Sequence, residues 1–474
     1  MKNKVFDISK KTFINVMIIL LSLLVFSIIL TFVIPKGKFL ETIENGEVIV
    51  HYDQYIKIDG KNGINIFKGI FAPILVLFSG DGLTILMLSL FILTITGAFQ
   101  IMNDCNGMKL IVQKLIARFK KNKKRLIALI ILIFMIFGSC FGLFEEVLIL
   151  LPLIMMLTLS LGYDSYTGFL ICIIATGFGF SSALTNPFTV ITASQILDIS
   201  PLTNLWYRLI IFGVMYGLLV LFVFHHLNVI EKDPLKSPTY QKDQEKLQNL
   251  SLESFDDTID NKRTYIAYLV FLLTILVTII TVTSIDAVRG YVVVFLIAIS
   301  LLGGIIAGYV SSKNIKCVLK SFVKGVVSGL PAILMILVAS SVKYILEEAE
   351  VLPTIANFIS VLVKNQNTFI VILLIFAIIL ILEFFISSST AKAVFVMGIL
   401  SCVSIDISKE MLVLAYLFGD GYTNVLFPTS PVLLIALTMT GINYTTWLKK
   451  SKWLFISTFI LVLIFLALGL IIGY

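Results

Sequence analysis

The chain has 474 residues, of which 58% are hydrophobic and 14% are charged, and its mean hydropathy is +1.03. This composition excludes a soluble globular protein and predicts a polytopic membrane protein in contact with the lipid bilayer. The formal net charge of +8 does not indicate nucleic-acid binding, because the basic residues cluster beside apolar segments, where they set membrane orientation.

The first third of the chain contains two predicted spans and a strong orientation signal. Residues 13–34 follow four lysines and are predicted to be a retained span with a cytoplasmic N-terminus. We expect a polar loop over 35–64, a helix or re-entrant piece over 65–80, and a second span over 82–102. The stretch 109–125 has eight basic residues and no acidic one, which places it in the cytoplasm.

Two segments are predicted to be re-entrant hairpins, and each precedes a broken span. The hairpins cover 125–161 and 368–404; two ordinary spans are the alternative for the first. The broken spans, 165–198 and 408–441, contain Thr185-Asn186-Pro187 and a polar, Gly- and Pro-containing stretch over 418–431. Freed backbone groups are tolerated in a membrane only inside protein or beside a watery cavity, which is where secondary transporters bind substrate. A kink without a ligand is the alternative.

The order of these segments predicts an inverted-topology repeat. We predict an all-α polytopic membrane protein with two re-entrant hairpins and two broken transmembrane helices. The first repeat covers 1–228, a charged and mobile cytoplasmic linker covers 229–263, a connecting span covers 264–283, and the second repeat covers 284–474. The remaining spans are predicted at 205–228, 291–310, 329–347 and 453–472, with a cytoplasmic amphipathic piece before the third of these.

Polar and ionisable residues inside the spans are the candidate ligands. Candidates for substrate binding are Glu145, Glu146, Thr185, Asn186, Ser388, Ser389, Thr390, Asp420, Thr423, Asn424, Thr429 and Ser430. Glu383 and Lys392 are candidates for coupling or pairing, and a structural ion pair is an equal alternative. The hairpin arms begin where helix N-terminal amides could receive a carboxylate, although hydroxyl capping explains the same residues.

The sequence contains no motif for catalysis or metal binding. It has no P-loop, no HExxH, and no Cys/His metal set, and its five cysteines are scattered. We therefore predict a protein that is not an enzyme and has no cofactor, with proton and sodium coupling both left open. A membrane-embedded enzyme is the less favoured alternative.

Five segments of the sequence resemble those of a known family. They are GSCFGLFEEVLILLP (138–152), Gly162-Tyr163-Asp164, the Thr-Asn-Pro break at 185–187, the hairpin tip Ser388-Ser389-Thr390-Ala391-Lys392-Ala393, and the polar stretch 418–431. Together they resemble the YfcC family of the C4-dicarboxylate anaerobic carrier group. The resemblance implies a multi-pass inner-membrane carrier, often a homodimer, that works by elevator-type alternating access. Some relatives are named arginine/ornithine antiporters and others carry dicarboxylates.

The hairpin tips differ from the Ser-Asn-Thr tips of sodium/dicarboxylate relatives, which favours another substrate and transport without sodium. We therefore predict a secondary transporter of amino acids, basic ones such as arginine above all, exchanged for ornithine. A C4-dicarboxylate or another organic acid is the alternative substrate.

Overall fold

A computed structural model of the protein describes most of the chain, and every structural statement below refers to the described part. The described residues are 10–44, 47–60, 63–111, 114, 122–252, 262–285, 288, 291–363, 366–386, 388–401 and 407–474. Part of the basic tract 109–125 and Ser387 of the second hairpin tip lie outside them.

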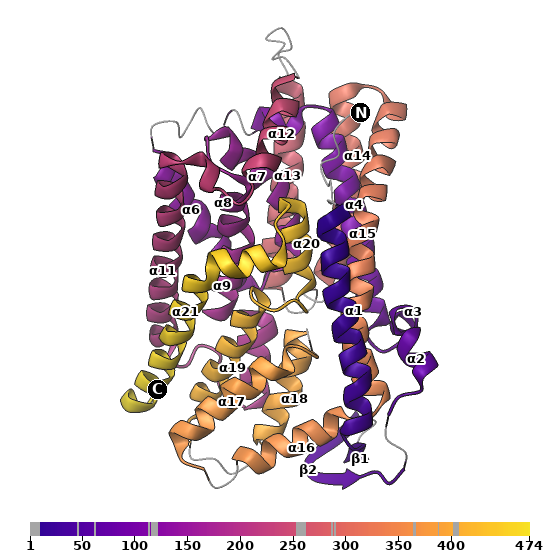
Figure 1. The fold of residues 1–474 in the computed structure, drawn as a ribbon, viewed down its shortest axis with the longest axis vertical. Helices are drawn as coiled ribbons and strands as arrows, with labels where there is room; N and C mark the ends of the chain where they lie inside the picture. Colours follow the sequence, from indigo (N-terminus) through magenta and orange to yellow (C-terminus); the bar gives the residue numbers. More distant parts are fainter. Residues whose placement is uncertain are drawn as a thin grey trace.

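One group of long helices lies toward the right of Figure 1, and each member packs against at least one other. The group consists of α1 (Lys10–Val33), α4 (Gly82–Asp104), α13 (Lys262–Ser284), α14 (Val292–Ser312) and α15 (Ile315–Glu348). Glycines bring the helices close: a Cβ atom on Gly325 of α15 would lie 2.3 Å from the Thr96 carbonyl oxygen of α4. Small residues let membrane helices approach in this way, so van der Waals contact holds the group together.

A second group contains both hairpins and both broken helices, and therefore mixes the two halves of the sequence. From the first half come α6 (Lys123–Ile136), α7 (Leu151–Ser160), α8 (Ser165–Phe169), α9 (Ala175–Ser181), α10 (Thr192–Ile196) and α11 (Leu205–Lys232). From the second half come α17 (Thr368–Leu382), α18 (Ser389–Ser401), α19 (Lys409–Asn424), α20 (Pro431–Thr440) and α21 (Tyr444–Ile472). The helix α16 (Leu352–Val363) connects α15 to α17. The division into repeats stays a prediction.

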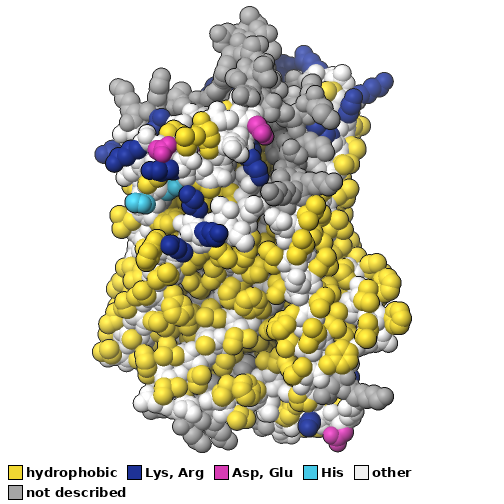
Figure 2. Space-filling view, in the orientation of Figure 1, with side chains coloured by type: hydrophobic (Ala, Val, Ile, Leu, Met, Phe, Trp, Pro, Cys, Tyr) yellow, Lys and Arg dark blue, Asp and Glu magenta, His cyan; other side chains and the backbone are white. Residues whose placement is uncertain are grey.

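The described chain contains eight helices that are long and apolar enough to cross a membrane. Hydrophobic side chains form a broad band on the face in Figure 2, and Lys and Arg gather toward one end. The predicted polytopic membrane protein is therefore confirmed. The re-entrant placement of the hairpins, the cytoplasmic N-terminus and the identity of the membrane stay predictions.

Two expectations about regular structure are wrong. The loop expected over 35–64 contains an antiparallel β-hairpin of β1 (Gly37–Glu44) and β2 (Glu47–Lys57). Valine, isoleucine and tyrosine in β2 favour a strand. The amphipathic piece and the span expected over 329–347 form the single helix α15, which continues through Pro331. As expected, 65–80 is helical, with α2 (Ile66–Ile70), α3 (Ala72–Leu75) and a 3-10 turn, Val76–Phe78.

The linker expected over 229–263 is docked on the protein as far as it is described. After α11 it forms a 3-10 turn, Pro234–Lys236, and α12 (Tyr240–Leu252). Residues 253–261 lie outside the described residues. Asp243 of α12 is 4% exposed and accepts a hydrogen bond from the Ser165 backbone amide at 2.9 Å. The expected mobility of 229–252 is therefore contradicted by a buried polar contact.

Candidate functional site

The first hairpin folds back on itself and its tip is bonded to the first break. Lys123 at the start of α6 donates a hydrogen bond to the Leu161 carbonyl after α7 at 2.6 Å, so the two ends lie together. A π-helical turn, Phe137–Phe141, follows α6. The Ser139 hydroxyl in this turn donates to the Ser182 carbonyl at 3.0 Å and accepts from the Leu184 amide at 3.0 Å. The hairpin tip thus replaces the helical hydrogen bonds that the break removes.

Thr185 and Asn186 in the first break make internal contacts with the same turn. The Asn186 amide nitrogen donates to the Gly138 carbonyl at 3.1 Å, and its oxygen accepts from the Phe188 amide at 2.9 Å. The Thr185 hydroxyl donates to the Cys140 carbonyl at 3.3 Å. Asn186 is fully buried. The side chains of both candidate ligands are therefore used in hydrogen bonds that hold the break against the hairpin turn.

The second break is shorter than the polar stretch suggests. The helix α19 runs without interruption to Asn424, and the chain is non-helical only over 425–430. The expectation that 418–424 is unwound is therefore wrong. A Cβ atom on Gly421 would lie 2.2 Å from the Ser181 Cα atom, and one on Gly419 would lie 2.6 Å from Ile379. These glycines allow α19 to cross α9 and α17 closely.

The four polar candidates around the second break differ in their side-chain hydrogen bonds. The Thr423 hydroxyl donates to carbonyls of the preceding helical turn at 2.8 and 2.9 Å. The Thr429 hydroxyl donates to the Glu383 carbonyl at 3.4 Å, and Ser430 caps α20. Within the described chain, no side-chain hydrogen bond of Asn424 is present, and this residue is 7% exposed. Asn424 is therefore the polar candidate whose side-chain amide remains available.

A buried ion cluster joins the second hairpin to α19. The Lys392 ammonium of α18 lies 2.8 Å from the Asp420 carboxylate and also pairs with Glu383. None of the three side chains is more than 2% exposed. The Ser389 hydroxyl donates to the other Asp420 oxygen at 2.8 Å. The structure thus contains the ion pair that was the alternative for Glu383 and Lys392, and it adds Asp420 as a third member.

The other residues of the second tip lie at the start of α18. The Ser388 hydroxyl accepts from the Ala391 amide at 3.3 Å and caps the helix. Ser388 and Thr390 are exposed. The tip therefore presents hydroxyl groups beside a helix N-terminus, which favours an anionic group.

The adjacent acids of the first hairpin, Glu145 and Glu146, differ in their exposure. Glu146 is 5% exposed and its carboxylate accepts from the Phe144 amide at 3.2 Å. Glu145 is exposed and, in the described part of the chain, its carboxylate makes no hydrogen bond or ion pair with another side chain. Glu145 is therefore the acid of this pair that is available to a ligand. When all groups are ionised, Glu145, Glu383, Asp420 and Lys392 carry three negative charges and one positive charge.

The described residues contain no group of three or more His, Cys, Asp and Glu side chains that could hold a metal ion. The available groups are a carboxylate, an amide and hydroxyls. This arrangement can bind a polar, cationic organic molecule through ion pairing and hydrogen bonds.

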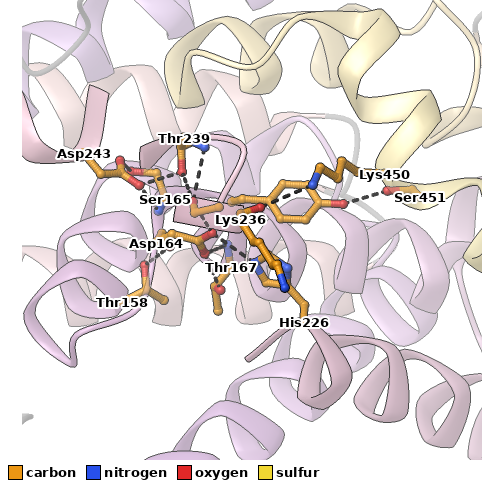
Figure 3. A network of polar contacts seen from close by, with 12 residues as sticks. Thr158, Asp164, Ser165, Thr167, His226, Lys236, Thr239, Asp243, Lys450 and Ser451 are labelled. Carbon is orange, nitrogen blue, oxygen red and sulfur yellow. Dashed lines mark hydrogen bonds and ion pairs between the residues drawn. The ribbon is translucent and has the colours of Figure 1, made fainter. Parts of the chain in front are cut away.

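A further polar network, which the sequence analysis missed, lies where α8 begins (Figure 3). The Asp164 carboxylate caps α8, accepts from Ser237 at 2.7 Å, and lies 2.9 Å from His226 Nε2. Asp243 binds Ser165 beside it. The Asp-Ser pair before a helix is a recognisable capping signal. Nothing in the sequence indicates that Asp243 of the linker lies against it.

Comparison with known proteins agrees with the resemblance of the motifs. The family model described as C4-dicarboxylate anaerobic carrier (DcuC) matches residues 13–471. YfcC of Escherichia coli (strain K12), by name a candidate basic amino acid antiporter, is 24% identical over 383 residues, which are 78% of this chain and 75% of YfcC. An uncharacterized protein of Haemophilus influenzae (strain ATCC 51907 / DSM 11121 / KW20 / Rd) is 24% identical over 367 residues, which are 76% of this chain and 70% of that protein.

Among solved structures, the YdaH transporter of Alcanivorax borkumensis aligns with a TM-score of 0.43 and 14% identity, covering 98% of both chains. The family match covers nearly the whole chain, and it confirms the family resemblance inferred from the hairpins and breaks. This protein therefore belongs to the C4-dicarboxylate anaerobic carrier family and is a multi-pass membrane protein of a transporter family.

Proposed function

We propose that this protein is a secondary active transporter of basic amino acids that exchanges arginine for ornithine by elevator-type alternating access. The observation that carries the proposal is the exposed Glu145 carboxylate of the first hairpin, together with a buried cluster at the second hairpin that has one more acid than base. A desolvated cation is very unfavourable without an acidic partner, and Glu145 supplies one.

The charges of arginine match the available groups. A guanidinium can form two parallel hydrogen bonds with one carboxylate, which suits Glu145. The substrate carboxylate can approach the N-terminus of α18, where Ser388 and Thr390 are exposed. The Asn424 amide can bond either end of the substrate. The name of the YfcC relative, a candidate basic amino acid antiporter, agrees with this assignment.

A dicarboxylate, which the family name suggests, fits these charges less well. It needs cationic partners for two carboxylates, but the Lys392 ammonium is fully buried and already pairs with Glu383 and Asp420. The exposed Glu145 would repel it. The charge balance near the two hairpin tips therefore supports a cationic substrate.

Neutralising each acid of the adjacent pair tests the proposal. In proteoliposomes, Glu145→Gln should raise the KM for arginine about 10- to 100-fold, because a hydrogen bond to a charged group contributes about 1.5–3 kcal/mol. Uptake of a neutral amino acid that the wild type accepts should change far less.

Glu146→Gln is the matched control, since it removes the same charge one residue away. It should leave the KM for arginine nearly unchanged, because the Glu146 carboxylate is buried and accepts a hydrogen bond from the Phe144 backbone amide. Equal responses of the two variants, or succinate competing better than arginine, would overturn the proposal.

A further inference from the structure

A cavity opens between α13 and α14, and none of its lining residues belongs to a hairpin tip. Its volume is about 890 Å³. Most of its wall is apolar, and several wall residues are exposed: Val270 is 56% exposed and Ile306 is 61% exposed. Gly303 of α14 deepens the wall, because a Cβ atom there would lie only 3.0 Å from the Phe271 ring. The cavity is thus an apolar groove on the outer side of a membrane-spanning helix pair.

The two ends of the groove differ in charge. Lys262 and Arg263 begin α13, and Lys313 follows the last residue of α14, so three exposed basic residues meet at one end. None of the described lining residues is acidic. The start of α13 and the end of α14 lie at the same end of the molecule in Figure 1, and Lys and Arg gather toward that end in Figure 2.

We propose that this groove is a binding site for an anionic phospholipid. The phosphate-containing headgroup lies among Lys262, Arg263 and Lys313, and one acyl chain lies along Val270 and Ile306 between the two helices. Basic pockets between membrane helices bind anionic headgroups, and the apolar groove keeps an acyl chain out of water. Basic residues that only set orientation would need no groove below them.

The site belongs to the helix group that contains α4, because α14 packs directly on that helix. A Cβ atom on Gly304 of α14 would lie 2.6 Å from the Ala98 Cβ atom of α4. The residues that line the groove belong to α13 and to α14 with its C-cap Lys313. They include none of the groups to which the proposed substrate binds.

Native mass spectrometry of the purified full-length protein tests the site. Phosphatidylglycerol should bind more tightly than phosphatidylcholine of the same chain length. The variant Lys262→Gln/Arg263→Gln/Lys313→Gln should bind phosphatidylglycerol about 100-fold more weakly, because each basic residue near an anionic headgroup contributes about a fivefold gain. Lys316→Gln/Lys320→Gln/Lys449→Gln removes the same charge from exposed positions elsewhere and should keep the preference.

A second variant separates a groove from a charged patch. Val270→Trp fills the apolar wall and leaves all three basic residues, and it should reduce binding of phosphatidylglycerol without changing thermal stability. Free inorganic phosphate should not compete, since it has no acyl chain. Any one of four results would overturn the proposal. They are equal binding of the two lipids, full binding of phosphatidylglycerol by Val270→Trp, competition by phosphate, and a groove variant that changes the oligomeric mass instead of the amount of bound lipid.

Discussion

Removing the Lys392 ammonium is the sharpest perturbation of the ion cluster. In Lys392→Met, the Glu383 and Asp420 carboxylates lose their shared cation, and both are at most 2% exposed. Removing one partner of a buried ion pair costs about 3–5 kcal/mol, because it leaves an uncompensated buried charge. We expect Lys392→Met to lose stability in this range. The loss should not exceed it, because Ser389 still donates one hydrogen bond to the Asp420 carboxylate.

The control for Lys392→Met removes all three charges together. Removing every charge of a buried ion cluster leaves no uncompensated charge, and with well-packed hydrophobic replacements the change is often neutral or stabilising. The triple variant Lys392→Met/Glu383→Gln/Asp420→Asn should therefore regain most of the stability that the single variant loses. Both are compared with the wild type by thermal unfolding of the purified protein in detergent.

The same variants test the expectation that transport does not require sodium. The two carboxylates left in Lys392→Met form an anionic pocket that can recruit a small cation, whereas Lys392 fills this role in the wild type. Sodium chloride should therefore raise the melting temperature of Lys392→Met more than choline chloride does, with no such difference in the wild type. Wild-type stability of Lys392→Met, or a triple variant as unstable as the single one, would refute the reasoning.

Three further predictions concern other parts of the structure. Gly421→Ala should abolish transport and lower the melting temperature, because its Cβ atom would lie 2.2 Å from the Ser181 backbone. The control Gly213→Ala should do neither, because its Cβ atom would meet open space. Equal effects of the two variants would contradict this prediction. Asn424→Ala should abolish uptake at unchanged melting temperature and expression, and wild-type uptake would leave this amide without a role. Burial acts to raise the pKa of Asp164, but the hydrogen bond and charge of His226 outweigh it and hold that pKa below its usual value. The stability that this carboxylate contributes is present above about pH 4 and is lost as the pH falls through its lowered pKa. Asp164→Asn should therefore flatten the decline of melting temperature in acid, and an unchanged decline would argue against the cap.

The spans were predictable because a membrane helix is specified by its own apolar residues. The expected span 82–102 is α4, and 264–283 lies within α13. Helix ends were less predictable. The lysines at 449–452 suggested a span starting at 453, but α21 begins at Tyr444. Charges indicate where a chain leaves the bilayer, whereas a helix can continue past that point; α15 likewise includes the lysines that precede the expected span 329–347.

The candidate site was only partly predictable. Its polar residues were identifiable because such side chains are costly in a membrane. Their partners were not, since Lys392 meets Asp420 through the packing of α18 against α19. The glycines at 419 and 421 suggested an unwound stretch, because glycine is unfavourable in a helix. Close packing against Ser181 and Ile379 outweighs that preference.

Substrate exchange by the wild-type protein tests the central claim most directly. Purified protein in proteoliposomes loaded with unlabelled ornithine should accumulate radiolabelled arginine with no sodium on either side. Excess external arginine should suppress the uptake, and equal succinate should not. Accumulation of labelled succinate in exchange for internal dicarboxylate, without any exchange of arginine, would contradict the account.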